Sequence, residues 1–410
     1  MDKQQIQRVK YACYSSGLTM SVVSSLSPVL FLTFRTLYGI SYSLLGLLVL
    51  ANFVTQLLVD LIFSFFSHRF DIPRTVKTIP LIAITGFIIY AGWSFLFPNN
   101  VYAGLLLGTI IFSAASGLAE ALISPVIAAL PADDPDREMS KLHSVFAWGV
   151  LVVITVCTVF LLVFGNENWQ WLTFLLMCVP IVSAFLFAGC KMPEMQTPGK
   201  VSGALKLLKN KQLWFCFFMI FLGGAAELVM SQWSSSYLEQ AMGIPKIWGD
   251  LFGVALFGLT MGIGRTLYSK IGKNIGRVLT LGAIGATLCY FLAAVSNIPF
   301  VGLFACAFTG FCVSMLWPGS LVVAAEKFPE SGVFIYAMMA AGGDLGASVG
   351  PQLVGIITDA VIAHPKGLAL AADLQLTADQ LGLKLGMLCG MLFPLAAIFF
   401  FLSVWKKKTP

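Results

Sequence analysis

Twelve apolar segments, each long enough to cross a lipid bilayer, limit most strongly how this chain can fold. A helix needs about 20 mostly apolar residues to cross the hydrocarbon core of a membrane. The expected spans are residues 11–33, 42–66, 76–97, 101–130, 140–165, 168–189, 212–241, 247–270, 276–296, 299–326, 332–363 and 380–404. The sequence therefore predicts an all-α membrane protein with twelve transmembrane helices.

The composition excludes a soluble globular domain. Apolar residues make up 58% of the chain and charged residues 11%, whereas a soluble domain carries about 25% charge. The nine cysteines lie almost all inside expected spans and form no Cys-x-x-Cys pair. We therefore interpret them as packing residues rather than disulfides or metal ligands. We expect no metal, no cofactor beyond a coupling ion, and no nucleic acid partner.

A polar stretch with five lysines, Lys191 to Lys211, separates six expected spans from six. We predict an N-terminal six-helix bundle at residues 1–190, a cytoplasmic linker at 191–211 and a C-terminal six-helix bundle at 212–410. Most of the 25 lysines and arginines lie at the amino terminus, in the even-numbered loops and in the tail. This bias places both termini in the cytoplasm. The short loops and the absence of any Asn-x-Ser/Thr site favour a bacterial inner (plasma) membrane.

The two halves repeat each other. The segment SGLAEALISP, residues 116–125, matches TGFCVSMLWP, residues 309–318, and the same offset carries Gly149 onto Gly342. A weaker match relates the basic turns at residues 67–76 and 269–278. We therefore expect pseudo-symmetric bundles, with the substrate site between them near mid-membrane and alternating access by rocking of one half on the other. Prolines inside spans are expected to bend their helices: Pro28, Pro125, Pro318 and Pro351.

Three acidic residues lie near the centres of their spans. Glu120, Glu227 and Asp344 fall within roughly 6 Å of the midplane, from the helical rise of 1.5 Å per residue. Such a carboxylate must carry a proton, pair with a cation or face a water-filled cavity. Arg265 is a basic residue inside a span, about five residues from a cytoplasmic end, where it can snorkel. We assign Glu120 to proton coupling, the alternative being a static hydrogen-bonded acid.

Other polar and aromatic residues suit a substrate site. Asn52, Gln56 and Asp60 recur every four residues on one helix face, which lines the cavity or bonds to a neighbouring helix. Deep tryptophans can stack on the apolar face of a sugar ring or simply pack. Asp344 stands among small residues, which also favour close helix packing. The substrate-binding candidates are Asn52, Gln56, Trp148, Glu227, Gln232, Trp233, Trp317 and Asp344, with a structural or gating role open for Glu227.

The chain resembles transporters of the major facilitator superfamily over its full length. Its two basic turns are similar to the loop motif of that family, with Asp71 where glycine is usual and His68 where aspartate is usual. The resemblance implies the twelve-helix major facilitator fold. It also implies that four basic residues belong to gating loops: Arg69, Arg74, Lys270 and Arg277.

Within the superfamily, the chain is similar to the fucose permease branch of sugar:proton symporters. Glu120 stands five residues before Pro125, and Glu227 stands six residues before Trp233, as in that branch. Ser124 replaces the asparagine that is usual there. The resemblance implies a proton-coupled transporter of a small sugar, working as a monomer in the lipid bilayer.

The residues themselves favour a neutral substrate. An anionic substrate would call for a midplane Arg or Lys, whereas a polyol needs amides, hydroxyls, acids and aromatic faces. We hypothesise proton-coupled sugar uptake. Export of a cationic or amphiphilic compound by proton antiport, and sodium-coupled sugar symport, remain open. A transporter-like sensor or membrane enzyme is a remote alternative, since the chain has no Gly-rich phosphate loop, zinc-type cluster or catalytic Ser, His, Asp arrangement.

Overall fold

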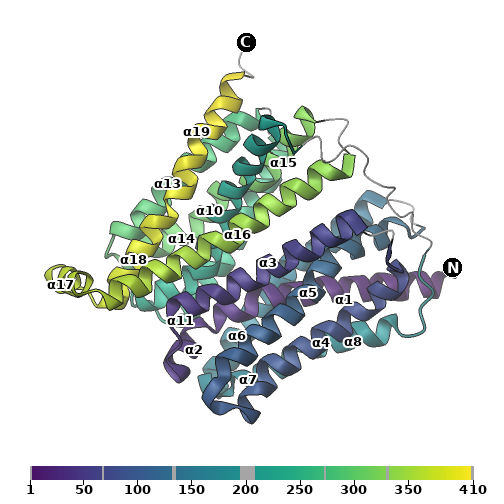
Figure 1. Cartoon of the computed structure of the whole chain (residues 1–410), viewed down its shortest axis with the longest axis horizontal. Helices are drawn as coiled ribbons and strands as arrows, with labels where there is room; N and C mark the ends of the chain where they lie inside the picture. The colour runs from purple at the N-terminus through teal and green to yellow at the C-terminus, as the bar shows by residue number, and fades with distance from the viewer. Residues whose placement is uncertain are drawn as a thin grey trace. The chain divides into compact units, whose positions relative to one another are not determined.

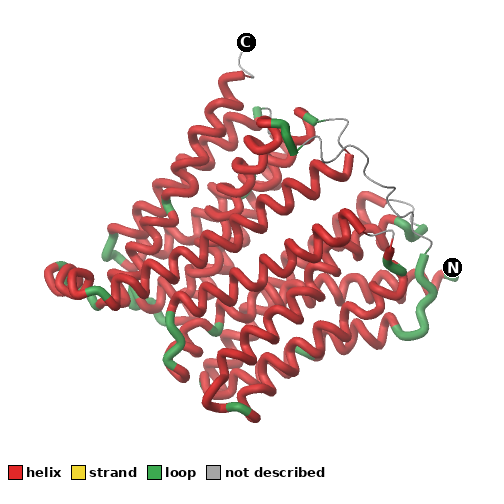
Figure 2. The backbone as a smooth tube through the Cα atoms, in the orientation of Figure 1, coloured by secondary structure: helices red, strands yellow, loops and turns green. Residues whose placement is uncertain are grey.

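The computed structural model of this chain describes residues 2–66, 69–131, 135–193, 208–271, 274–328 and 332–407. Helices run through nearly all of these residues, and no strand occurs among them (Figure 2). In this part of the chain, 11 helical segments are long and apolar enough to cross a membrane. The pair α1 (Lys3–Val29) and α2 (Phe31–Tyr38), bent by 45°, makes up to 12. The all-α, twelve-span prediction is thus confirmed.

By their contacts, the residues form two compact units, which we call unit 1 and unit 2. Unit 1 comprises residues 1–33 and 54–201, and unit 2 comprises residues 34–53 and 202–410. Helix α3 (Tyr42–Phe66) therefore begins in unit 2 and ends in unit 1. The predicted boundaries at 190 and 212 stay a prediction, and residues 194–207 of the expected linker lie outside the described residues.

The other helices are labelled in Figure 1. Unit 1 holds α4 (Ile72–Leu96), η2 (Pro98–Asn100), α5 (Val101–Ala128), α6 (Pro135–Phe164), η3 (Asn166–Asn168), α7 (Trp169–Leu176) and α8 (Cys178–Phe187). Unit 2 holds α10 (Lys211–Gln240), α11 (Lys246–Trp248), the π-helix η4 (Gly249–Ala255), α12 (Leu256–Ile271), α13 (Ile275–Val295), α14 (Pro299–Val313), α15 (Leu316–Lys327), α16 (Gly332–Ala363), α17 (Pro365–Asp373), α18 (Ala378–Gly390) and α19 (Leu392–Lys407).

Prolines explain three breaks inside spans. A proline has no backbone N–H, so the carbonyl four residues earlier loses its helical donor. The breaks between α7 and α8, α14 and α15, and α18 and α19 each come four residues or fewer before a proline: Pro180, Pro318 and Pro394. The expected bend near Pro28 is the one between α1 and α2. Pro125 and Pro351, by contrast, lie within helices that continue through them.

The repeat seen in the sequence is also a repeat of contacts. Gly117 of α5 lies against α3, where an added Cβ would come within 3.1 Å of the Cα of Gln56. Its counterpart Gly310 in α14 lies against the second span of its own half, where a Cβ would be 2.7 Å from Thr260 Oγ1. The fourth span of each half therefore approaches the second span at a glycine, because a side chain there would clash.

The second glycine pair behaves in the same way. An added Cβ on Gly149 of α6 would come within 2.7 Å of Leu18 Cδ1 in α1. An added Cβ on Gly342 of α16 would lie 3.0 Å from the carbonyl oxygen of Phe217 in α10. The fifth span of each half thus packs on the first span at equivalent positions. Two sequence matches therefore correspond to two pairs of matching helix contacts.

All nine cysteines are free thiols. Seven of them are buried, Cys389 is half-buried and Cys178 of α8 is exposed. Most of the thiols therefore pack among apolar side chains, away from water.

Candidate functional site

An ion pair in unit 2 involves two charged residues of neighbouring spans. Glu227 of α10 is 14% exposed, and its Oε1 lies 3.7 Å from Nη2 of Arg265 in α12. Its Oε2 is buried and has no hydrogen-bond partner among the described residues. The sequence left Arg265 as a residue that can snorkel, and the structure adds that its guanidinium has protein partners within the unit. The carboxylate therefore keeps one oxygen available to accept a donor.

The same arginine contacts the break in the tenth span. Arg265 Nε donates a hydrogen bond to the carbonyl oxygen of Ser314 at 3.1 Å. Ser314 stands four residues before Pro318, so the residue that would donate to this oxygen in an α-helix has no N–H. Arg265 therefore joins the Glu227 carboxylate to a helix break. Unit 1 does not repeat this break, since α5 continues through Pro125.

Trp233 and Gln232, both predicted for substrate binding, are buried in this structure. The Trp233 ring has no exposed surface, and its Nε1 donates to the Pro351 carbonyl oxygen at 2.9 Å. Gln232 is 8% exposed. The contact with α16 accounts for the burial of Trp233, so a substrate could reach its ring only after helices move.

Trp317 and Asp344 meet the small residues that surround them. The Trp317 ring covers two glycines. An added Cβ on Gly224 of α10 would lie 3.0 Å from its Cζ3, and an added Cβ on Gly343 of α16 would come still closer to its Cη2. Trp317 remains half-buried, whereas the neighbouring Asp344 is 8% exposed. The glycines therefore make room for an aromatic ring between α10, α15 and α16.

In unit 1 the structure brings two acids together. Asp60 of α3 and Glu120 of α5 lie close enough for their carboxyl groups to interact electrostatically. Asp60 is half-buried and Glu120 is exposed. Gln56, one turn before Asp60 on α3, is buried, and so is Asn52 in the part of α3 that belongs to unit 2. The polar face predicted on this helix therefore leads to the proposed coupling residue.

Trp148 lines an open depression in unit 1. The depression has a volume of about 580 Å³ and lies between α1 and α6. Its lining residues are Tyr14, Leu18, Lys141, Ser144, Val145, Trp148, Gly149 and Val152. Trp148 is 66% exposed, in contrast to the buried Trp233. Aromatic faces and polar groups thus share one wall, the combination that suits a ligand with apolar and hydroxylated faces.

The two basic turns that were predicted to act as gates each contain a residue that caps the following helix. Asp71 Oδ1 accepts from the backbone N–H of Arg74 at 3.1 Å and begins α4. Asn274 makes the same contact with the N–H of Arg277, at 3.0 Å, and begins α13. The Asp71 that departs from the family motif is thus an N-cap. Arg69 lies over the Phe66 ring at 5.4 Å. His68 and the side chain of Lys270 lie outside the described residues.

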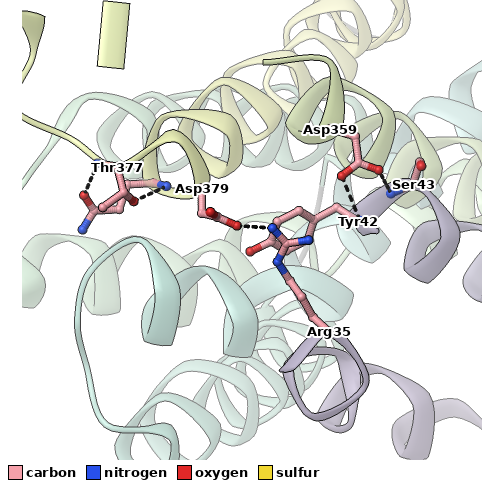
Figure 3. A network of polar contacts seen from close by, with 7 residues as sticks. Arg35, Tyr42, Ser43, Asp359, Thr377 and Asp379 are labelled. Atoms are coloured by element: carbon pink, nitrogen blue, oxygen red, sulfur yellow. Dashed lines mark hydrogen bonds and ion pairs between the residues drawn. The ribbon is translucent and has the colours of Figure 1, made fainter. Parts of the chain in front are cut away.

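Sequence reasoning missed a polar network within unit 2. Arg35 Nη2 lies 2.5 Å from Asp379 Oδ1, and its guanidinium carbon lies 4.0 Å from the centre of the Tyr42 ring (Figure 3). Asp379 lies in the first turn of α18, which is fixed by a capping box between Thr377 and Gln380. The pair therefore joins α2 to the start of the last span.

Asp359 of α16 completes this network. Its two carboxylate oxygens accept from the backbone N–H groups of Tyr42, at 3.0 Å, and Ser43, at 2.7 Å (Figure 3). These N–H groups are at the start of α3 and have no helical acceptor. An aspartate of another helix thus caps α3, favoured by the positive end of the helix dipole. We call Arg35, Tyr42, Asp359 and Asp379 the latch.

Comparison with known proteins gives a family. The sequence profile of the Major Facilitator Superfamily matches residues 12–351. The chain is 25% identical over 366 residues to membrane protein MosC of Rhizobium meliloti, with 88% of this chain and 85% of MosC covered.

Solved structures share the fold at low sequence identity. A bacterial homologue of the human lysosomal transporter Spinster has a TM-score of 0.74 at 13% identity, covering 99% of this chain and 98% of its own. A D-xylose-proton symporter has a TM-score of 0.73 at 14% identity, covering 95% and 97%. FucP, the E. coli fucose:proton symporter, has a TM-score of 0.62 at 13% identity in its outward conformation, covering 96% and 98%. These structures do not single out the fucose permease branch, which stays a prediction.

Proposed function

The chain belongs to the major facilitator superfamily, whose members transport solutes by alternating access, and we propose that this one is a proton-coupled symporter for uptake of a neutral sugar. The proposed location is a bacterial inner membrane, with both termini in the cytoplasm and the protein acting as a monomer. The coupling ion would be a proton, carried without any bound cofactor.

The approach of Asp60 to Glu120 carries the proposal of cation coupling. Two negative charges on neighbouring helices repel each other, and the repulsion is strong where water is scarce. Binding of one proton between them relieves this repulsion. We assign proton exchange to Glu120, which lies near the centre of its span and beside a second carboxyl group. The charge of Glu120 acts in turn on Asp60, so the two carboxyl groups favour holding one proton between them.

The depression beside Trp148 supports the choice of a sugar. A sugar ring offers an apolar face for stacking on an indole and hydroxyls for polar partners such as Ser144 and Lys141. Two transporters of similar fold are proton symporters of xylose and fucose. Their likeness extends only to the fold, so the identity of the sugar has to come from a transport assay.

The test is a screen of hexoses, pentoses and polyols for uptake into proteoliposomes with an imposed inward proton gradient. We expect one sugar to accumulate only with the gradient. Glu120→Gln should abolish accumulation while leaving sugar exchange within about twofold of wild type, because the amide cannot carry a proton. Asp373→Asn, which removes an exposed carboxylate of α17, serves as the matched control and should leave both activities unchanged.

The acid pair of unit 1 also favours a second candidate, proton-coupled export of a cationic or amphiphilic compound, since two carboxylates attract a cationic solute. Failure of every sugar to move under either a proton or a sodium gradient would contradict the proposal of sugar uptake. Accumulation that follows sodium instead of protons would contradict proton coupling alone.

A further inference from the structure

The break in the tenth span leaves one carbonyl that its own helix cannot satisfy. Helix α14 ends at Val313, and α15 begins at Leu316. Pro318 has no N–H for the oxygen of Ser314, and an unpaired buried carbonyl is costly. Arg265 Nε supplies the missing donor at 3.1 Å. The side chain therefore replaces a backbone hydrogen bond that the proline removes.

The neighbouring glycine makes this contact possible. An added Cβ on Gly264 would come within 2.8 Å of Ser314 Cβ and 3.2 Å of the Phe311 carbonyl oxygen. Helix α12 can thus approach the break closely at Gly264, which brings the next residue, Arg265, beside the free oxygen. In unit 1 the corresponding α5 continues through Pro125. The arrangement is a feature of the second half.

The other end of the guanidinium faces Glu227. Its Nη2 lies 3.7 Å from Glu227 Oε1, and the second carboxylate oxygen is buried with no donor in the part of the chain that the structure describes. Because the guanidinium is planar and rigid, a shift of one nitrogen moves the others. A donor bound at Glu227 Oε2 therefore weakens the attraction on Nη2 and changes how Arg265 holds Ser314.

We propose that Arg265 is a positioning residue that links occupancy of the Glu227 carboxylate to the shape of the broken α14–α15 helix. The ligand class for Glu227 Oε2 is a hydrogen-bond donor, as in the hydroxyls of a polyol. This inference rests on the proposed transport of a sugar for its ligand, but its structural part stands without it. Arg265 does not itself contact substrate.

Thermal unfolding of the full-length protein in detergent tests the structural part without any substrate. Arg265→Gln should lower the unfolding midpoint. In a Pro318→Ala background the same change should lower it by less than half as much, because residue 318 then donates to Ser314. In a Pro125→Ala background, the matched control, the loss should be the same as in wild type, since that proline is in the other unit.

A second double-mutant cycle, with Glu227 in place of Pro318, tests the charge pair. Arg265→Gln should cost less in a Glu227→Gln background, because no uncompensated carboxylate is then left behind. Additive losses in either the Pro318 or the Glu227 background would overturn the proposal, because Arg265 would then not couple to one of the two groups that it is proposed to link.

Transport kinetics separate positioning from direct binding. With the solute found by the proteoliposome screen, Arg265→Lys and Arg265→Gln should lower the maximal rate about tenfold and change the half-saturation concentration by less than about twofold. A raised half-saturation concentration with an unchanged maximal rate would make Arg265 a substrate ligand and overturn the proposal. Non-additive cycles in a protein that moves no sugar would remove the sugar assignment and keep the link through Arg265.

Discussion

Two tryptophans that look alike in the sequence have different surroundings in the structure. Trp148 and Trp233 both lie near the centres of apolar spans, so composition gives no means of separating them. Trp233 is enclosed and hydrogen-bonded to α16, whereas Trp148 is 66% exposed on a depression. Spans that are apolar on every side carry little helical phase information. Which face of the helix is buried therefore follows only from packing.

Replacing Trp148 should affect substrate binding and leave stability unchanged. Trp148→Ala removes a stacking surface and should raise the half-saturation concentration about tenfold, whereas Trp148→Phe should raise it less. The unfolding midpoint should not change, because the ring is exposed. Sugar uptake measured over a range of concentrations checks this, and an unchanged half-saturation concentration for Trp148→Ala would contradict stacking.

Trp233→Phe should have the opposite result. The substitution removes the indole hydrogen bond to the Pro351 carbonyl, which α16 also uses as a helical acceptor, and this costs about 0.5–1.5 kcal/mol in the free energy of unfolding. Thermal or denaturant unfolding in detergent measures this loss. A variant as stable as wild type would show that another group takes the place of the indole.

At the scale of helices, the start of α3 depends on a residue that is distant in sequence. Asp359 accepts from the N–H of Tyr42 across 317 positions of the chain. Local sequence predicts caps formed by neighbouring residues, such as Asp71 before α4 and Thr377 before α18. Local sequence cannot predict a cap whose acceptor belongs to another helix. For the same reason the sequence did not indicate the latch.

Removing this cap should weaken the latch. Asp359→Ala leaves two N–H groups of α3 without acceptors and should lower the free energy of unfolding by about 1 kcal/mol or more. Arg35→Ala and Asp379→Ala should each destabilise by less, since their pair is partly exposed. Unfolding midpoints of the three variants, with Asp373→Ala as the control, test this order. Equal midpoints for Asp359→Ala and Asp373→Ala would exclude the cap.

At the scale of the whole molecule, α3 is continuous through both units. It passes from unit 2 into unit 1 between residues 53 and 54. Any movement of one unit relative to the other must therefore bend α3 or release the contacts of residues 34–53. The latch holds these residues to α16 and α18, so we expect it to open during each transport cycle.

Cross-linking tests this expectation. The double variant Arg35→Cys with Asp379→Cys, once cross-linked, should lose transport, and reduction should restore it. The matched control replaces Ser16 and Ser183, whose hydroxyl oxygens lie 2.9 Å apart between α1 and α8 within unit 1. Its cross-link should leave transport intact. Full transport by the cross-linked 35–379 variant would show that the latch stays closed throughout the cycle.

The sequence predicted the architecture better than the site. Long apolar runs determine the spans and follow from local sequence, whereas the helix that packs against each repeated glycine is known only from the structure. The Glu227–Arg265 pair and the approach of Asp60 to Glu120 depend on the rotation of helices that are apolar on most sides. The proline positions predicted places for bends. Whether a helix breaks there depends on a partner such as Arg265, which lies 49 residues from Ser314.

The buried thiols make this protein convenient for chemical probes. A water-soluble maleimide reacts with accessible thiolates, and seven of the native thiols are enclosed. Burial also raises the pKa of Cys190, beyond the end of α8, so little of it is thiolate near neutral pH. Cys178 faces outward from a membrane-spanning helix, where lipid excludes a polar reagent. A single fluorophore could therefore be attached to an engineered cysteine with little labelling of the native thiols, and its emission would report helix movement during transport.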